Sequence, residues 1–326
     1  MSSQATTGTP ERRSLQSKPS TLPDKLFFGI ATAAAYSAIV IILLVLIFLL
    51  IRAYPAFASQ GVIPFITGAG WDNSLEPHLM HIGPMLYGSF LIATLGVSFA
   101  VPMAISVAYF IEFMAPRSIA KIATIVVDFL AAIPSIVMGL WGLTVLTPVA
   151  SGWSEQIHNA LGFIPIFAHE EGNFLNSPFI AALVIGVMIV PIIASVTREI
   201  FSQMDQEIIK ASLALGGNRE STFRKVILPT AAGGITGGVL LGLGRALGET
   251  VAIYFVLNLV FDDFNWFKIL EPQGGNVASL ILSKFGEATE QEVTGLMAAG
   301  VVLFVATLIV NAFASYIVAK AQPWRK

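Results

Sequence analysis

The chain has 326 residues, of which 55% are apolar and 12% are charged. Soluble globular domains carry roughly 25% charged residues, so this composition excludes an ordinary water-soluble enzyme and favours a membrane protein. The formal net charge of −2 gives no support to a nucleic-acid-binding protein. The sequence contains 0 cysteines, which excludes disulfides, thiolate nucleophiles and cysteine metal ligands.

The N-terminal residues 1–25 are rich in Ser, Thr, Pro and charge. We expect a disordered cytoplasmic tail there, because such a segment cannot bury enough apolar surface to offset its chain entropy. Residues 26–51 contain no charge until the following Arg52 and are long enough to cross a bilayer. A secretory signal is a poorer interpretation, because the run exceeds the roughly 7–15 apolar residues of a signal.

Five further apolar runs predict five more membrane-spanning helices, so the expected fold is an all-α membrane protein with six transmembrane helices. The runs are Met85–Ile111, Ile122–Ala150, Phe179–Thr197, Ala231–Val260 and Val293–Ala319. The third run contains Asp128, and the fifth contains Arg245 and Glu249. These three charged residues are candidates for function, because charged side chains inside a bilayer are costly.

Lys and Arg are unevenly distributed between alternate connections, which predicts the orientation of the chain. Most of them lie in the two termini and in the connections after spans two and four, whereas Arg52, Lys268 and Lys284 lie on the other side. Both termini are therefore expected in the cytoplasm. The external loop 52–84 has aromatic residues and few charges, so part of it is expected in the membrane interface, with docking of an external partner as the alternative.

All four histidines, at positions 78, 81, 158 and 169, fall in the predicted outer loops. His78 and His81 are three residues apart, but they lack the helical context of a zinc motif, so we predict no metal site. The outer loop 151–178 carries Glu155, Glu170 and Glu171 and no Lys or Arg. Such a loop does not attract free anions, so an anionic cargo would need a separate capture protein.

The cytoplasmic connection Gln206–Thr230 predicts two short helices around a turn. Ile208, Ala211 and Leu215 share one helical face, and Gly216 permits the positive φ that ends a helix. Asn218 can cap the next helix, which Pro229 is expected to stop. A partner groove and the bilayer surface are equally good locations for such helices.

This segment resembles the coupling motif of ABC-importer permeases, Glu-Ala-Ala, three residues, Gly, then Ile-x-Leu-Pro after nine residues. The spacing matches throughout, although Lys210 stands where the family has Glu, and Glu207 lies one turn earlier. The resemblance implies insertion of the loop 206–229 into a cytoplasmic ATPase through the following residues: Glu207, Lys210, Ala211, Leu215 and Gly216. The sequence has no G-x-x-x-x-G-K-[ST] phosphate loop, so ATP and magnesium are expected on a separate ATPase, with no cofactor on this chain.

Arg245 lies near the middle of the fifth run, where a charge costs at least about 2.5–3.5 kcal/mol on insertion scales. Glu249 follows four residues later, on the same face of a continuous helix, where it would neutralise Arg245 in the absence of cargo. A purely structural salt bridge from Arg245 to Glu249 or to Asp128 is the alternative. A functional arginine is favoured, because guanidinium stays charged and binds phosphate or carboxylate bidentately.

Gly234, Gly238 and Gly242 repeat every four residues along the same run. Close helix packing is the favoured interpretation of this spacing. A hinge, or a seam against a second permease subunit, are the alternatives.

Two further segments, "LGLGRALGET" at 241–250 and "FLAAIPSIVMGLWG" at 129–142, resemble signatures of the phosphate-specific transporter permeases of PstC type. In that family the Arg and Glu of the first signature are linked to phosphate movement, which implies a substrate pathway at Arg245 and Glu249, with Asp128 nearby. The resemblance implies a type I ABC importer bundle whose core is residues 85–326. It also implies a PstA-type second permease, an ATPase dimer and an external phosphate-binding protein as partners, in a bacterial cytoplasmic membrane. The cargo could instead be sulfate or molybdate, and a proton-coupled carrier is a more distant alternative.

Overall fold

The computed structural model describes residues 22–72, 74–75, 78–170 and 172–321. Residues 1–48 and 49–326 form two separate compact units. Most of the predicted N-terminal tail lies outside the described residues, as do Glu171 and the C-terminal residues 322–326. Residues 22–25 of the predicted tail are helical.

The first helix, α1 (Leu22–Gln60), is longer than the predicted span. It continues beyond Ile51 through Arg52 and Pro55, so the start of the predicted external loop is helical. Up to Phe48 its apolar side chains are exposed, as lipid contact requires. Within the second unit, Ala53 and Ala56 near its end are buried.

The rest of the outer loop 52–84 is folded. It contains α2 (Val62–Thr67) and an antiparallel pair of short strands, β1 (Trp71–Asp72) and β2 (Leu79–Met80), with Trp71 opposite Met80. The buried indole Nε1 of Trp71 donates to Glu292 Oε1 across 2.6 Å. This bond fixes the strand pair to α13 (Glu290–Ala321).

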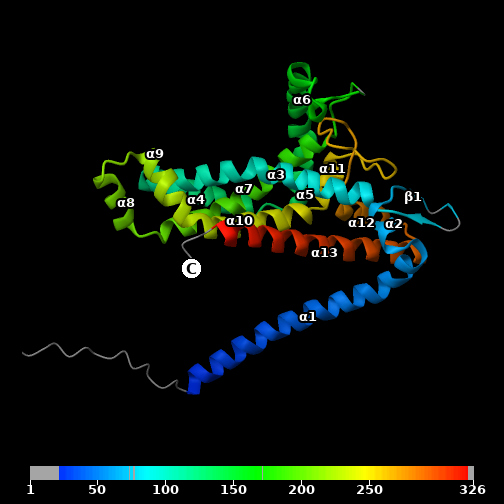
Figure 1. Cartoon of the computed structure of the whole chain (residues 1–326), viewed down its shortest axis with the longest axis horizontal. Helices are drawn as coiled ribbons and strands as arrows, with labels where there is room; N and C mark the ends of the chain where they lie inside the picture. The colour runs from blue at the N-terminus through cyan, green and yellow to red at the C-terminus, as the bar shows by residue number, and fades with distance from the viewer. Residues whose placement is uncertain (1–21, 73, 76–77, 171, 322–326) are drawn as a thin grey trace, which may run out of the picture. The chain divides into compact units, whose positions relative to one another are not determined.

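Four helices form the centre of the bundle and lie side by side in Figure 1. They are α3 (Gly83–Tyr109), α7 (Pro178–Ser202), α10 (Leu228–Leu247) and α13. The most apolar stretch of α7 is 67% buried, the largest share of any candidate span among the described residues. Ile185, Ile189 and Ile193 form the middle of this core, which explains why α7 reads as an almost uninterrupted apolar sequence.

The glycine repeat of α10 packs against α7, as the favoured interpretation predicted. A Cβ on Gly238 would lie 3.1 Å from Val196, and one on Gly242 would lie 2.9 Å from Ile193. Gly234 faces Ile200 in the same way. The missing side chains therefore allow α10 and α7 to approach closely.

The third predicted span is broken, so the prediction of one helix over 122–150 is wrong. The π-helical turn η1 (Phe110–Met114) leads into α4 (Arg117–Ala131), and a turn at 132–134 precedes α5 (Ser135–Trp141). Pro134 lacks an amide hydrogen and disfavours helical geometry in the residue before it, which explains the break. A π-helical turn, η2 (Gly142–Leu146), continues into α6 (Thr147–Leu161), which leaves the bundle steeply in Figure 1.

Six helices in the described part of the chain are long and apolar enough to cross a membrane, which matches the predicted number. The third of them covers 135–161 rather than 122–150, so Asp128 lies on α4, before that span.

The remaining elements lie at the two ends of the bundle. On the predicted cytoplasmic side are α8 (Gln206–Ala214), α9 (Arg219–Thr222) and the π-helical turn η4 (Phe223–Ile227). On the other side are the short η3 (Pro165–Phe167), α11 (Val251–Val256) and α12 (Val277–Phe285). Ile269 N donates to Ile166 O across 3.2 Å, so the predicted outer loop 151–178 is joined to the segment between α11 and α12.

Candidate functional site

The fifth predicted span is interrupted at the position of its charged residues. α10 ends at Leu247, and α11 begins at Val251 after an irregular Gly248–Thr250 segment. Interrupted helices in membrane proteins leave backbone groups available where a cavity or pathway is lined. The break therefore locates the candidate site at Gly248–Thr250, whereas the apolar run in the sequence extended over residues 231–260.

Arg245 lies in the last turn of α10 and is exposed. Gly237 and Leu241 precede it at intervals of four and are also exposed, with Leu241 58% accessible. Among the described residues, no ion pair of Arg245 is found. A guanidinium is favourable at a helix C-terminus, because the carbonyl ends of the helix carry partial negative charge. Arg245 is thus a positive group on an otherwise small and apolar face.

Glu249 does not pair with Arg245, and the prediction of a shared helical face is wrong. The helix ends between the two residues, so Glu249 turns into the break and is only 7% exposed. Its carboxylate Oε1 accepts a hydrogen bond from Ala252 N across 3.4 Å at the start of α11. Glu249 therefore shapes the break instead of neutralising Arg245.

Asn276, a residue that the sequence reasoning missed, holds the break from the other side. Its fully buried side chain donates through Nδ2 to the main-chain oxygen of Glu249 across 2.5 Å. Its Oδ1 accepts from Ser279 N across 2.7 Å and forms a capping box at the start of α12. The order Asn-Val-Ala-Ser was the available signal, since a capping residue followed three positions later by a polar residue predicts a helix start.

Asp128 pairs with a residue other than Arg245. Its Oδ1 lies 3.9 Å from an amino group of Arg198 and accepts a hydrogen bond from Ser195 across 3.2 Å. Arg198 also donates to Thr124 Oγ1 across 2.7 Å. The alternative salt bridge between Asp128 and Arg245 is therefore contradicted, and Arg198 is a second arginine whose partner the sequence did not identify.

The connection between α7 and α10 contains the two predicted short helices and the predicted turn. Gly216 has a φ of +88°, and Asn218 caps α9 by accepting from Ser221 N across 2.7 Å. Lys210 Nζ lies 2.9 Å from Glu207 Oε1, so these two exposed side chains form an ion pair within α8. The turn needs glycine because other residues are strained at positive φ.

Pro229 does not end the second helix, contrary to the prediction. The amide of Leu228 bonds to Phe223 O five residues earlier, which forms the wide turn of η4. This wider turn accommodates a proline ring that would clash in an ordinary helix, so the chain continues directly into α10. Ile227 is buried in a cluster with Phe223, and the Phe223 ring lies 4.5 Å from that of Tyr109. α9, η4 and α10 therefore form one uninterrupted helix, whereas the turn at Gly216 separates α8 from it.

α8 and the turn that follows it expose several apolar side chains. Leu215 is 89% exposed, Ile208 48% and Leu213 43%. Charged residues flank them, as in helices that insert an apolar face into a partner groove.

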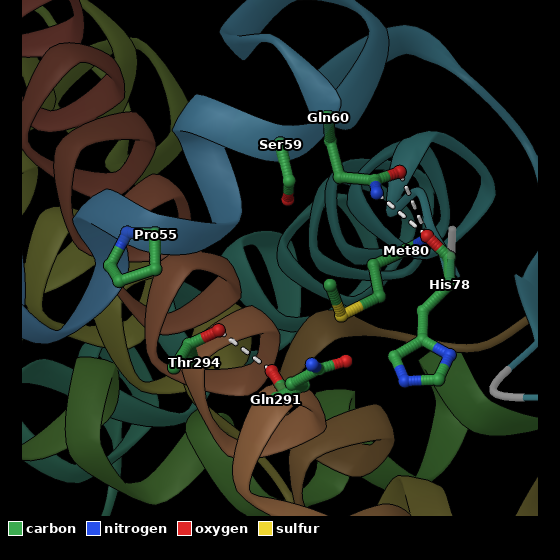
Figure 2. A pocket seen from close by; sticks show the side chains of 7 residues that line it. All are labelled: Pro55, Ser59, Gln60, His78, Met80, Gln291 and Thr294. Atoms are coloured by element: carbon green, nitrogen blue, oxygen red, sulfur yellow. Dashed lines mark hydrogen bonds between the residues drawn. The ribbon is translucent and has the colours of Figure 1, made fainter. Parts of the chain in front are cut away.

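A separate pocket of about 550 Å³ lies between the end of α1, β2 and the start of α13 (Figure 2). Gln60 spans its edge, where Nε2 donates to His78 O across 2.6 Å and Oε1 accepts from Met80 N across 3.3 Å. None of the predicted site residues lines it. His78 and His81 each bond to a main-chain oxygen, and no group of three metal-binding side chains occurs among the described residues.

A family model described as "Binding-protein-dependent transport system inner membrane component" matches residues 100–322. The chain belongs to this family. The matched region begins within α3 and includes the broken third span, the α8–α9 segment and the Arg245 site.

Relatives and solved structures agree with this assignment. The chain is 36% identical over 303 residues to "Phosphate transport system permease protein PstC 2" of Mycobacterium tuberculosis, covering 91% of this chain and 92% of the relative. It is 34% identical over 305 residues to PstC of Haemophilus influenzae, covering 89% and 92%. Its fold is similar to a chain of a bacterial alginate ABC transporter crystal structure, with a TM-score of 0.58, 15% identity and coverage of 92% and 98%. The predicted PstC-type resemblance and the type I importer permease fold are thereby confirmed.

Proposed function

We propose that this chain is the permease subunit of an ATP-driven importer that moves inorganic phosphate across the bacterial cytoplasmic membrane, with both termini in the cytoplasm. The names of its relatives support phosphate as the cargo. The observation that carries the proposal within this chain is Arg245, an exposed arginine beside an interrupted membrane helix.

Lipid is a poor environment for Arg245, because a charge near the bilayer centre costs at least about 2.5–3.5 kcal/mol. The face of α10 that carries it therefore lines an aqueous pathway, which a PstA-type second permease subunit completes. Gly237 on the same face leaves open space, since a Cβ there would meet no atom within 4 Å. Phosphate binds the planar fork of the guanidinium bidentately during passage.

Glu249 and Asn276 act by positioning Arg245. They hold the irregular Gly248–Thr250 segment, so the last turn of α10 presents the guanidinium at a fixed level. Asp128 contributes through Arg198, whose side chain is 26% exposed while that of Asp128 is 53% exposed. Their exposure supports a polar environment on the α4 side of α7 as well.

Transport energy enters through α8 and its turn. The exposed Leu215 inserts into a groove of a cytoplasmic ATPase, together with the Lys210–Glu207 pair and the turn at Gly216. ATP and magnesium bind that ATPase dimer, and closure of the dimer moves the α8–α9 segment. η4 transmits the movement to α10, which carries Arg245.

Replacement of Arg245 tests the pathway in proteoliposomes that contain the assembled transporter and internal ATP. Arg245→Ala should lower the rate of labelled phosphate uptake roughly 10- to 100-fold, the range for losing a charge-assisted hydrogen bond of about 1.5–3 kcal/mol. Arg245→Lys should retain part of the rate, because it keeps the charge without the fork. Arg117→Ala, at an exposed position on α4, is the matched control and should transport normally. Normal uptake by Arg245→Ala in an assembled complex would contradict the pathway.

A further inference from the structure

Three aromatic side chains on the outer loop that follows α11 gather around Tyr87 of α3. We call Tyr87, Phe264, Trp266 and Phe267 the aromatic patch. The ring of Tyr87 lies 5.2 Å from Trp266 and 5.9 Å from Phe267, and Phe264 stacks on Trp266 at 4.8 Å. This loop lies on the opposite half of the bundle from α8 and α9 (Figure 1). Stacked and edge-to-face contacts of this kind fix the rings relative to one another.

The patch is rigidly presented and yet uncovered. Trp266 is 61% exposed and Phe267 is 60% exposed. Phe267 has a φ of +58°, an unfavourable conformation for a bulky residue, and its amide donates to the hydroxyl of Tyr87 across 2.9 Å. Backbone strain of this kind persists only where surrounding contacts impose it, and such positions cluster at binding sites.

Acidic side chains surround the patch. Asp262 and Asp263 precede it and are exposed, and Glu170 lies on the same pocket of about 330 Å³ as Trp266. Lys268 also lines that pocket, but its ammonium is 2.6 Å from Glu170 and is therefore compensated. The buried side chain of Asn265 adds an acceptor, Oδ1, that has no hydrogen-bond partner within the described residues. The exposed Asp262 and Asp263 thus place two carboxylates beside the rings, and the pocket wall holds one buried acceptor without a partner among the described residues.

We propose that the aromatic patch and its acidic rim are the docking surface for the external phosphate-binding protein, and that this partner presents lysines or arginines around an apolar notch. The inference rests on the proposed function and names the residues and the chemistry of that contact. Rigid exposed aromatics are the side chains that dominate protein–protein binding energy. Carboxylates beside the rings favour a basic protein partner over lipid, because insertion at headgroup depth would bury those charges.

Binding measurements on the assembled transporter in nanodiscs test the proposal, with the purified, phosphate-loaded binding protein as the probe. Trp266→Ala should raise the dissociation constant at least 10-fold, the size of a hot-spot loss. Trp153→Ala on α6, where Trp153 is 46% exposed, is the matched control and should leave it unchanged. The double change Asp262→Asn with Asp263→Asn should slow association and weaken its salt dependence. Equal dissociation constants for Trp266→Ala and the unchanged protein would overturn the proposal.

A labelling experiment separates protein docking from lipid contact. Because the sequence has 0 cysteines, Asp262→Cys gives a single attachment site for a fluorophore. Addition of the binding protein should shift the emission, whereas brominated lipids alone should not quench it. Quenching by brominated lipids before the binding protein is added would overturn the docking surface in favour of membrane contact.

Phosphate uptake by the unchanged transporter distinguishes failure of the docking surface from failure of the proposed function. If it imports labelled phosphate but Trp266→Ala binds the partner normally, only the docking surface fails. If it imports no phosphate, the proposed function fails.

Discussion

The side-chain amide of Asn276 donates to the main-chain oxygen of Glu249 across 2.5 Å and so joins the break in the fifth span to the start of α12. Both residues are buried, and the same asparagine caps α12 through its Oδ1. Ser89 on α3 accepts from Val277 N across 3.1 Å, which ties a third helix to this point. The geometry beside Arg245 therefore depends on residues that are far apart in the sequence.

Asn276→Asp should remove the hydrogen bond from this side chain to Glu249 O while keeping its bond to Ser279 N. Aspartate retains the oxygen that caps α12 but cannot donate to Glu249 O, which leaves a buried carbonyl unsatisfied at a cost of about 1–3 kcal/mol. We expect an assembled transporter with a lower thermal midpoint and slower phosphate uptake. Full uptake by Asn276→Asp would show that the bond to Glu249 does not position Arg245.

Gly88→Ala tests the close approach of α3 to the loop before α12. A Cβ at this position would collide with the main-chain oxygen of Gly275, next to Asn276. Because backbone cannot move aside as a flexible side chain can, we expect a loss of about 1–3 kcal/mol in the free energy of unfolding. Gly237→Ala is the matched control, since a Cβ there would meet no atom within 4 Å. Denaturation midpoints of the purified chains measure the difference, and equal midpoints would contradict the prediction.

Leu215→Asp should detach the ATPase. Leu215 is 89% exposed, and a carboxylate at this position would have to enter the apolar groove of the partner without compensation. The measurement is the amount of ATPase that copurifies with the permease, and we expect it to fall at least tenfold. Leu215→Met keeps the apolar volume and should copurify normally. Undiminished copurification of Leu215→Asp would place the docking surface elsewhere.

The ion pair between Lys268 and Glu170 contributes a stabilisation that depends on pH. A hydrogen bond and the charge of Lys268 lower the pKa of Glu170, and the hydrogen bond to Glu170 raises the pKa of Lys268. For Glu170 the stabilisation is present above its unfolded pKa and is lost as the pH falls through the lowered folded value. For Lys268 it is present below the unfolded pKa and is lost as the pH rises through the raised folded value.

Lys268→Met should therefore lower the thermal midpoint slightly at neutral pH, and this difference from the unchanged protein should vanish in acid below the lowered pKa of Glu170. The side chain of Glu170 is 75% exposed and that of Lys268 is 36% exposed, so solvent screening will keep the effect small. Thermal unfolding in detergent between pH 3 and about pH 9 measures it. A difference that persists undiminished at pH 3 would contradict the assigned pair.

The sequence predicted the helices well and their interruptions poorly. Apolar runs identify membrane spans because a bilayer requires them, and the Gly216 turn and the Asn218 cap follow from local backbone rules. The break after Leu247 could not be read in the same way, because an apolar run looks identical whether its helix is continuous or interrupted. Glu249 was therefore assigned to the face of Arg245, although tertiary bonds turn it inward.

Contacts between residues that are far apart in the sequence could not be predicted from the sequence either. Asp128 lies 67 positions from the hydroxyl of Ser195 that it binds, and Glu249 lies 27 positions from Asn276. Nothing local fixes such pairs, which depend on how α4, α7 and α12 pack.

Cargo identity is the central claim, and uptake of labelled phosphate and labelled sulfate at limiting concentrations tests it most directly, in cells with and without this chain. The account predicts that removal of the chain abolishes high-affinity phosphate uptake and leaves sulfate uptake unchanged, and that Arg245→Ala restores at most about a tenth of the phosphate uptake. Loss of sulfate uptake with phosphate uptake intact would contradict it.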